Sequence, residues 1–282
     1  METSEYQCEL DESSNKKAWL ELHEDPKERL GAASTLREWV RQQDWLRTPT
    51  DDKYLLSFLR ARKFSQLGAR ELLENYWTVR TKLPEWYSDV DPADNKPSEK
   101  SFDDVMRANL ALFDYLLLDE NIQVNGFVFI VDLTGFTRQH FMATGVENSK
   151  KCMLVTQKAL PGRIKELHYY NTGSVFETIF NLIRPLMSEK LRNRVHVHGQ
   201  NLTTVYDKID MSLLPEEYLP DDYEGPKAGC IQDIADNLAK SLLQPKIKKF
   251  IVDLHSGKYG VDLSKKSKDS EPQASFRKLN VS

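Results

Sequence analysis

Apolar residues recur every three or four positions through the first third of the chain, which is the spacing of amphipathic helices. Pro49 and Pro84 mark two helix ends, since proline cannot continue a helix. Thr50 or Asp51 offers an N-cap for the second helix, and Ser65 offers one for the third. We therefore predict a small helical unit of three helices, over residues 28–45, 53–62 and 66–83.

A different pattern begins beyond residue 101. The stretch before it, residues 89–101, has two prolines and mixed charge, which is typical of a linker. Short runs of Val, Ile and Phe then alternate with helical patterns, and this alternation favours an α/β layer with a largely parallel sheet. The first run indicates a buried strand. Strands are predicted at residues 127–133, 164–170 and 195–197, and helices at 102–118, 150–159, 175–183 and 231–243.

These patterns divide the chain into five parts. They are an acidic N-terminal segment (1–27), a helical N-terminal domain (28–83), a linker (84–101), an α/β domain (102–255) and a C-terminal tail (256–282). The tail is rich in Lys and Ser, and we expect it to dock, if at all, through Phe276 and Leu279.

Composition narrows the class of protein. With 282 residues, 40% apolar and 29% charged, the chain is too hydrophobic for a disordered protein and too polar for a membrane-spanning one. Residues 1–11 carry acids but no hydrophobic signal-peptide core. Cys8, Cys152 and Cys230 lack metal-ligand spacing, which suits a reducing compartment. We expect a cytoplasmic globular protein.

Charge is distributed unevenly along the chain. The net charge of −4, from 39 basic and 43 acidic residues, argues against a dedicated nucleic-acid binder. Residues 1–30 hold nine acids and four bases, whereas residues 158–194 hold seven bases and three acids. The second segment therefore has a local net charge of +4 that the average conceals.

Enzyme fingerprints are missing from the sequence, including the glycine-rich phosphate loops, the nucleophile elbow and the zinc-protease motif. Asp132 ends a predicted strand, where an α/β enzyme places an acid, but capping of the turn at Thr134 and Gly135 is favoured. Cys152 has no base near it in sequence and is interpreted as a small core residue. We expect no catalytic residue and no enzymatic activity.

Three histidines deserve separate consideration as metal ligands. His196 and His198 are two apart on one predicted strand and share a face, and His168 lies on a strand that can neighbour it. A metal site needs a further ligand and supporting hydrogen bonds, and the sequence supplies no obvious carboxylate beside these rings. Ordinary strand or surface histidines are favoured, so we expect no metal and no cofactor.

The predicted helix at 175–183 has one wide apolar face. Basic residues precede and follow it along the chain. A core helix accounts for the apolar face, while the flanking cations favour a surface that meets anionic lipid, where apolar burial and charge attraction add together. Pattern alone leaves these two interpretations open.

Several co-linear motifs resemble those of the CRAL-TRIO lipid-transfer family. Residues 52–64, DKYLLSFLRARKF, resemble the N-terminal signature of this family. Its core motif is resembled by residues 161–171, PGRIKELHYYN, followed by Phe176, IRP at 183–185, EK at 189–190 and HVHG at 196–199. LPEEY at 214–218 resembles the motif that comes next. YGVD at 259–262 and SFRKL at 275–279 resemble the tails of insect members near the tocopherol-transfer and retinaldehyde-binding proteins.

The resemblance implies a helical unit beside an α/β lipid-binding domain with a gated pocket. The gate matches residues 171–187. A phosphoinositide-binding cleft is implied at Arg62, Arg163, Lys165, Lys190 and Arg194. An apolar lipid pocket is implied at Val131, Phe136, Cys152, Val155, Thr156, Leu160, Leu167, Phe176, Ile179, Phe180 and Ile183.

The chain also departs from the family pattern. A segment that relatives place between the elements matching Pro84 and Leu110, including the first strand of the sheet, is missing, and Asn109 and Phe113 replace small hydroxyl residues of tocopherol binders. We expect a monomer that carries a retinoid, tocopherol, carotenoid or phospholipid-like molecule and transfers it at phosphoinositide-containing membranes as a peripheral protein. The alternative is a membrane-binding adaptor without stable cargo.

Overall fold

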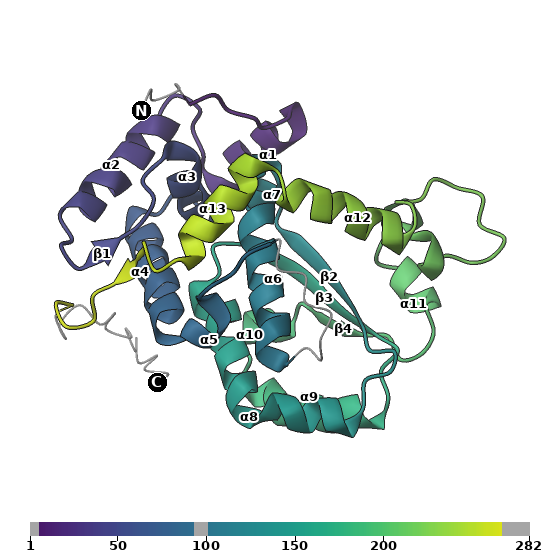
Figure 1. Ribbon diagram of the computed structural model, residues 1–282. Helices are drawn as coiled ribbons and strands as arrows, with labels where there is room; N and C mark the ends of the chain where they lie inside the picture. Colours follow the sequence, from purple (N-terminus) through teal and green to yellow (C-terminus); the bar gives the residue numbers. More distant parts are fainter. Residues whose placement is uncertain (1–5, 93–100, 267–282) are drawn as a thin grey trace, which may run out of the picture.

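A computed structural model gives the arrangement of the chain and describes residues 6–92 and 101–266, apart from the side chains of Phe141 and Ala143. A helical unit packs beside a mixed helix and sheet layer, and the chain returns to the helical unit at its end (Figure 1). The class of fold predicted from the sequence, a helical unit followed by an α/β layer with a parallel sheet, is therefore confirmed.

The helical unit consists of helices around one apolar core, and two of these helices begin at residues whose side chains cap them. Asp51 caps α3 by accepting from the Tyr54 backbone N–H at 2.9 Å, and Ser65 caps α4 by accepting from that of Gly68 at 3.2 Å. The elements are α1 (Glu12–Leu22), α2 (Arg29–Arg41), β1 (Leu46–Arg47), α3 (Asp52–Ala61), α4 (Gln66–Lys82) and α5 (Pro84–Tyr87). The first predicted helix ends at Arg41 rather than at Trp45, and α1 forms within the acidic N-terminal segment, for which no element was predicted.

A three-stranded parallel sheet forms the α/β layer in the order β2-β3-β4. Its elements are α6 (Phe102–Leu116), α7 (Glu120–Asn125), β2 (Phe127–Asp132), α8 (Arg138–Leu154), a π-helical turn η1 (Val155–Ala159), β3 (Ile164–Tyr170), α9 (Ser174–Ile183), a 3-10 turn η2 (Arg184–Leu186), α10 (Glu189–Arg192) and β4 (Val195–Val197). Phe129 pairs with Leu167, and Leu167 pairs with Val195, so these three side chains share one face.

β2 lies at an edge of the sheet, and the expectation that it is a buried strand is wrong. Val128 is 52% exposed and Ile130 is 37% exposed, because they lie on the same sheet face as Glu166 and His168 of β3, and this face is partly open to solvent. The predicted loss of a first strand concerns the chain between Pro84 and Leu110, part of which, residues 93–100, lies outside the described residues.

The last part of the chain returns to the helical unit (Figure 1). Its elements are α11 (Thr203–Tyr206), the 3-10 turns η3 (Met211–Leu213) and η4 (Glu216–Tyr218), α12 (Ile231–Leu242), α13 (Pro245–His255) and β5 (Gly260–Val261). Leu46 of β1 pairs with Val261, and Leu254 and Val261 join the core of the helical unit. The tail therefore docks through β5, while Phe276 and Leu279 lie outside the described residues.

Two buried polar networks join the helical unit to the layer. The guanidinium of Arg60 on α3 donates to Glu24 at 2.7 and 2.9 Å and to Glu120 of α7 at 2.7 Å. Arg80 on α4 donates to Asp114 of α6 at 2.9 Å, and the imidazole of His255 lies 2.9 Å from the same carboxylate. Elements far apart in sequence are thus held by charged hydrogen bonds away from water.

Candidate functional site: an apolar sheet face, a basic cleft and a histidine cluster

The inner face of the sheet is apolar and only partly covered. Phe129 of β2 stacks 6.2 Å from Phe113 of α6, and Tyr169 of β3 lies 4.9 Å from Phe176 of α9 by ring centroids. These contacts place α6 and α9 over the inner face. Val197 is nevertheless 47% exposed, so apolar surface remains uncovered at the β4 side.

The gate segment, residues 171–187, has apolar side chains both buried in the protein and exposed to solvent. Phe176 and Ile179 are buried, and Phe180 stacks on Phe176 with ring centroids 5.5 Å apart. Leu182 on the same helix is 59% exposed. The backbone N–H of Ser188, just beyond the gate, donates to the side chain of Gln157 in η1 at 2.8 Å. One end of this segment is therefore tied to η1 while apolar side chains face both the protein and solvent.

The residues of the predicted lipid pocket fall into three groups. Val131 and Leu167 lie half-buried on the inner face of the sheet, and Phe136 follows β2. The second group is on the end of α8, on η1 and just beyond it: Cys152, Val155, Thr156 and Leu160. The third group is on α9: Phe176, Ile179, Phe180 and Ile183.

Some of these residues pack into side-chain clusters. Val155, with Cys152 against it, packs in a cluster formed with α4, α5 and α6, and Leu160 packs against Phe113 and Phe127. A cavity of about 470 Å³ lies alongside, between α8, η1 and the end of the gate. It is lined by Lys150, Met153, Leu154, Gln157, Lys158, Leu186, Met187 and Ser188, which alternate with the predicted residues rather than coincide with them.

Basic side chains gather where the α3–α4 turn, the start of β3 and α10 meet. The pKa of Lys190 is lowered by partial burial and then by neighbouring positive charges, those of Arg194, Arg62, Lys63 and Arg163. The pKa of Lys165 is lowered by partial burial and next by Arg163. Lys190 therefore lies within electrostatic range of Arg62, Arg163 and Arg194, and Lys165 within range of Arg163, while Lys63 is an addition that the prediction missed. We call these six residues the basic cleft, after the site that the family resemblance implies.

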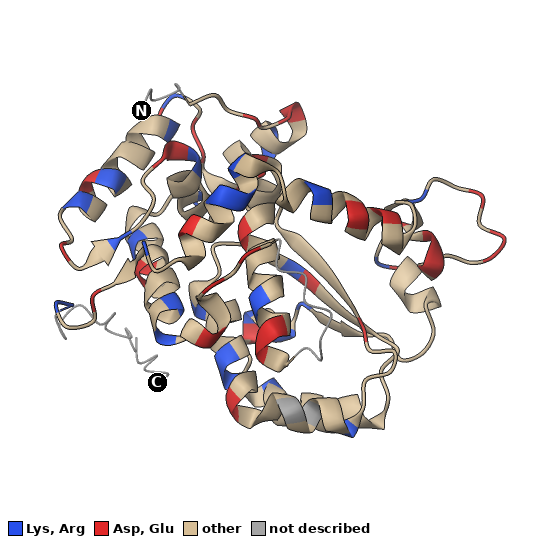
Figure 2. Ribbon diagram, viewed as in Figure 1, with Lys and Arg blue, Asp and Glu red and all other residues tan. Residues whose placement is uncertain are grey.

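An acidic residue outside this set partly neutralises the basic cleft. The carboxylate of Glu21 on α1 accepts from Arg163 at 3.0 Å and lies 3.5 Å from the Lys165 ammonium. The hydrogen bond from Arg163 lowers the pKa of Glu21. Acidic and basic residues are both spread along the ribbon of the helical unit (Figure 2), so the cleft is a local concentration of positive charge rather than part of a uniformly basic surface.

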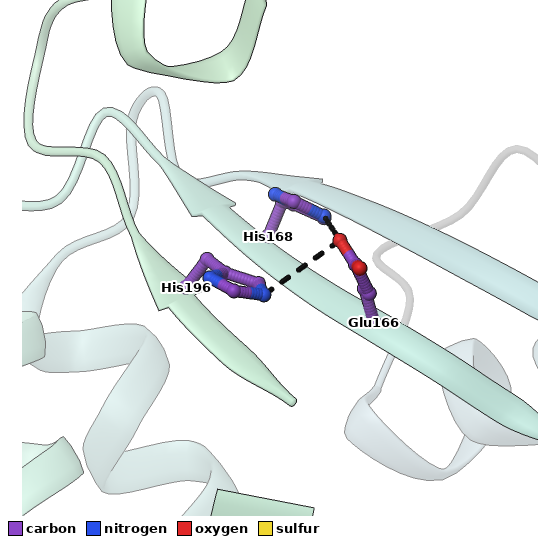
Figure 3. Close-up of side chains that lie close together, drawn as sticks. All are labelled: Glu166, His168 and His196. Atoms are coloured by element: carbon purple, nitrogen blue, oxygen red, sulfur yellow. Dashed lines mark hydrogen bonds and ion pairs between the residues drawn. The ribbon is translucent and has the colours of Figure 1, made fainter. Parts of the chain in front are cut away.

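A histidine cluster occupies the opposite, outer face of the sheet (Figure 3). Glu166 Oε2 lies 2.8 Å from His168 Nε2 on the same strand and 3.6 Å from His196 Nε2 on β4. His168 Nδ1 lies 2.8 Å from His198 Nε2, and His198 Nδ1 lies 2.8 Å from the Thr204 hydroxyl. The expectation that no carboxylate stands beside these rings is wrong, because Glu166 is two residues from His168 and therefore shares its face.

Asp132 has the role that the sequence favoured. Its Oδ1 atom accepts from the backbone N–H and the hydroxyl of Thr134, at 2.8 and 2.6 Å, and its Oδ2 atom accepts from the Tyr218 hydroxyl at 2.8 Å. These bonds fix the turn after β2 and lower the pKa of Asp132 against the opposing effect of partial burial. The carboxylate is a structural cap.

Comparison with known proteins decides the family. The CRAL/TRIO domain model matches residues 80–218. The alpha-tocopherol transfer protein-like protein of Mus musculus is 32% identical over 244 residues, covering 76% of this chain and 71% of its own. The chain belongs to the CRAL-TRIO family. A second match, to the Pinta-like UBA domain, covers residues 25–96 of the helical unit.

Other CRAL-TRIO relatives are more distant. Clavesin-1 of Rattus norvegicus is 28% identical, covering 75% of this chain and 69% of its own. A solved structure of Sfh5 aligns with 78% of this chain and 91% of its own at 14% identity, with a TM-score of 0.40, too low to add to the assignment. Membership of the CRAL-TRIO family supports lipid binding and transfer in general. The insect branch stays a prediction.

The described residues contain no helix that is both long and apolar enough to span a bilayer.

Proposed function

We propose that the chain holds a small hydrophobic lipid against the inner face of the sheet, under α9, and exchanges it at phosphoinositide-containing membranes. The observation that supports this most directly is the partly uncovered apolar face beside a gate segment with apolar side chains on both sides. Covering apolar surface is worth roughly 25 cal/mol per Å². A lipid with a long apolar body gains that free energy without requiring many polar partners.

The bulk of Phe113 bears on which lipid is carried. Its ring centroid lies 4.2 Å from that of Phe127, and a Cβ added at Gly162 would lie 2.8 Å from the Phe113 ring. This packing removes space at a position where tocopherol binders of the family have small side chains. We therefore rank tocopherol below retinoid, carotenoid or phospholipid-like cargo, although relatives carry tocopherol transfer in their names.

Native mass spectrometry of the purified full chain, followed by lipid extraction, tests the cargo. One lipid molecule for each protein molecule supports carriage. A protein that is reproducibly empty, and stays empty after incubation with retinoid, carotenoid and phospholipid vesicles, contradicts it. Phe113→Ser is the informative variant, since it restores space beside Gly162 and should raise the bound fraction of tocopherol relative to the unaltered chain.

The membrane contact is proposed at the basic cleft. Each Lys or Arg near an anionic bilayer contributes about 1 kcal/mol of attraction, so several together hold the protein at a surface rich in phosphoinositides. Glu21 competes with a headgroup for Arg163 and Lys165. The place of action that follows is the cytoplasmic face of a membrane, where the chain acts as a peripheral, monomeric carrier and performs no chemical reaction.

Vesicle co-sedimentation tests the cleft with charge-matched variants. Lys63→Glu with Lys190→Glu should weaken binding to phosphoinositide vesicles at least tenfold, whereas Lys240→Glu with Lys246→Glu, at exposed positions outside the basic cleft, should leave it nearly unchanged. Glu21→Gln should strengthen binding, because it frees two cations. Equal effects of the two double variants would contradict the assignment of the cleft.

A membrane adaptor without cargo is the second candidate. The packing of Val155, Cys152 and Leu160 in filled side-chain clusters favours it, since these positions were predicted to face a lipid. The two candidates give opposite results in the lipid extraction and the same result in co-sedimentation. An empty protein that binds phosphoinositide vesicles would replace the carrier with the adaptor.

A further inference from the structure

The histidine cluster on the outer sheet face belongs to neither the lipid face nor the basic cleft. Glu166, His168 and His196 each direct one ligand atom toward a common point, and these three atoms all lie within 4.8 Å of one another (Figure 3). The sheet itself builds the arrangement. Glu166 and His168 are two residues apart on β3 and so share a face, and His168 pairs with His196 on the neighbouring strand β4. We propose that Glu166, His168 and His196 bind a Zn²⁺ ion.

The donor set suits zinc in chemistry and in size. Two imidazole nitrogens and a carboxylate oxygen are a common zinc ligand set, with bonds of about 2.0–2.2 Å. Tetrahedral geometry at such bond lengths separates the ligand atoms by about 3.4 Å. The separations of 2.8 Å from Glu166 to His168 and 3.6 Å from Glu166 to His196 lie on either side of that value, and the two imidazole nitrogens lie within 4.8 Å of each other. Small side-chain rotations would admit the ion.

Water can supply the remaining ligand. The side chain of Glu166 is 40% exposed and that of His196 is 27% exposed, while that of His168 is fully buried. The ion would therefore sit at the boundary between the sheet and solvent, with three protein ligands on one side. A position open to water is typical of zinc sites with three protein ligands.

The hydrogen bonds behind His168 fit both the metal-free and the metal-bound site. Without metal, the Thr204 hydroxyl donates to His198 Nδ1, His198 Nε2–H donates to His168 Nδ1, and His168 Nε2–H donates to Glu166. With zinc on His168 Nε2, that ring donates through Nδ1–H to His198 Nε2, and His198 donates through Nδ1–H to Thr204. The His168 and His198 rings each carry one proton in both arrangements, so the ion leaves no nitrogen of these two rings without a partner.

One neighbouring charge opposes the ion. The ammonium of Lys208 is near enough for its charge to act on both His168 and His198. A cation there weakens the binding of a divalent ion through like-charge repulsion. The proposal therefore predicts that removing this charge tightens zinc binding, an effect opposite in sign to the loss of a ligand.

Zinc titration of the full chain tests the site, after treatment with a chelator and in competition with a chromophoric chelator. We expect one Zn²⁺ for each chain, with affinity reduced at least tenfold by Glu166→Gln and by His196→Gln. Glu166→Gln keeps an oxygen that accepts from His168, so folding is preserved and circular dichroism should be unchanged. Lys208→Met should tighten binding severalfold. Glu177→Gln and His140→Gln, at exposed positions on α9 and α8, are the matched controls.

Nitrogen-15 NMR of the imidazole rings gives a readout that stability alone does not affect. Zinc should convert His168 from the Nε2–H tautomer to the Nδ1–H tautomer, with the same change at His198. Two results would overturn the proposal and show that the cluster is only a hydrogen-bond chain. One is equal zinc affinity of the ligand variants Glu166→Gln and His196→Gln and their controls Glu177→Gln and His140→Gln. The other is a His168 tautomer that zinc does not change. The test is independent of lipid carriage, because it uses the metal alone.

Discussion

The helical unit and the α/β layer bury their apolar residues to very different degrees. The apolar residues of α3 are fully buried: Leu55, Leu56, Phe58 and Leu59. On β2, by contrast, Val128 is 52% exposed and Ile130 is 37% exposed. The core of the helical unit is thus closed, with Leu254 and Val261 from the end of the chain as part of it. The layer leaves apolar surface exposed on both sheet faces and on α9, whereas the exposed apolar side chains of the helical unit, such as Leu20 and Leu67, lie outside its core.

The largest effect is expected at the junction of the two regions. Arg60→Met removes the cation shared by Glu24 and Glu120; the buried carboxylate of Glu120 loses this partner, while Glu24 keeps its ion pair with Arg29. Breaking a buried pair in this way costs about 3–5 kcal/mol of the free energy of unfolding. Urea unfolding measures the loss. Arg41→Met, at a pair whose side chains are both more than half exposed, is the control and should cost less than about 1 kcal/mol.

A pair of leucine substitutions compares the two regions directly. Leu56→Ala leaves a cavity in the closed core and should cost about 2–5 kcal/mol of unfolding free energy. Leu182→Ala removes a side chain that is 59% exposed on α9 and should stay within about 0.5 kcal/mol. The comparison fails if both variants lower the urea midpoint by the same amount.

A smaller effect is expected from pH. Burial opposes ionisation of Asp114, but the charge of Arg80 and the hydrogen bond from His255 prevail and lower its pKa from 3.8 to about 2. Because the folded state has the lower pKa, this stabilisation is present above pH 4 and is lost as the pH falls toward 2. It amounts to about 2 kcal/mol. Acid unfolding followed by circular dichroism should show a shallower slope between pH 4 and 2 in Asp114→Asn, relative to its own stability at pH 5.

Local patterns in the sequence predicted the elements that depend on local chemistry. The spacing of Leu55, Leu56 and Leu59, with Asp51 before them, is sufficient to place α3, and the apolar residues around Phe176 are sufficient to place α9. Long-range pairings gave no such signal. The strand at Leu46 exists only because Val261 lies beside it, more than two hundred residues later in the chain.

The candidate sites divide in the same way. Five residues of the basic cleft were predicted because they match a family motif, but Glu21 was missed because it reaches Arg163 from a helix 142 residues earlier in the chain. The position of Glu166 beside His168 could have been predicted from the sequence, since residues two apart on a strand share a face. Its distance to His196 depends on the register of β3 and β4, which no local pattern encodes.

The short ladder between β1 and β5 has a consequence for synthesis of the protein on the ribosome. Leu254 and Val261 complete the core of the helical unit, although the whole α/β layer separates them from it in sequence. The segment made first must therefore wait, with part of its core uncovered, until about two hundred more residues have been translated, roughly 10–40 s at ordinary elongation rates. During that interval the nascent helices are a natural target for chaperones.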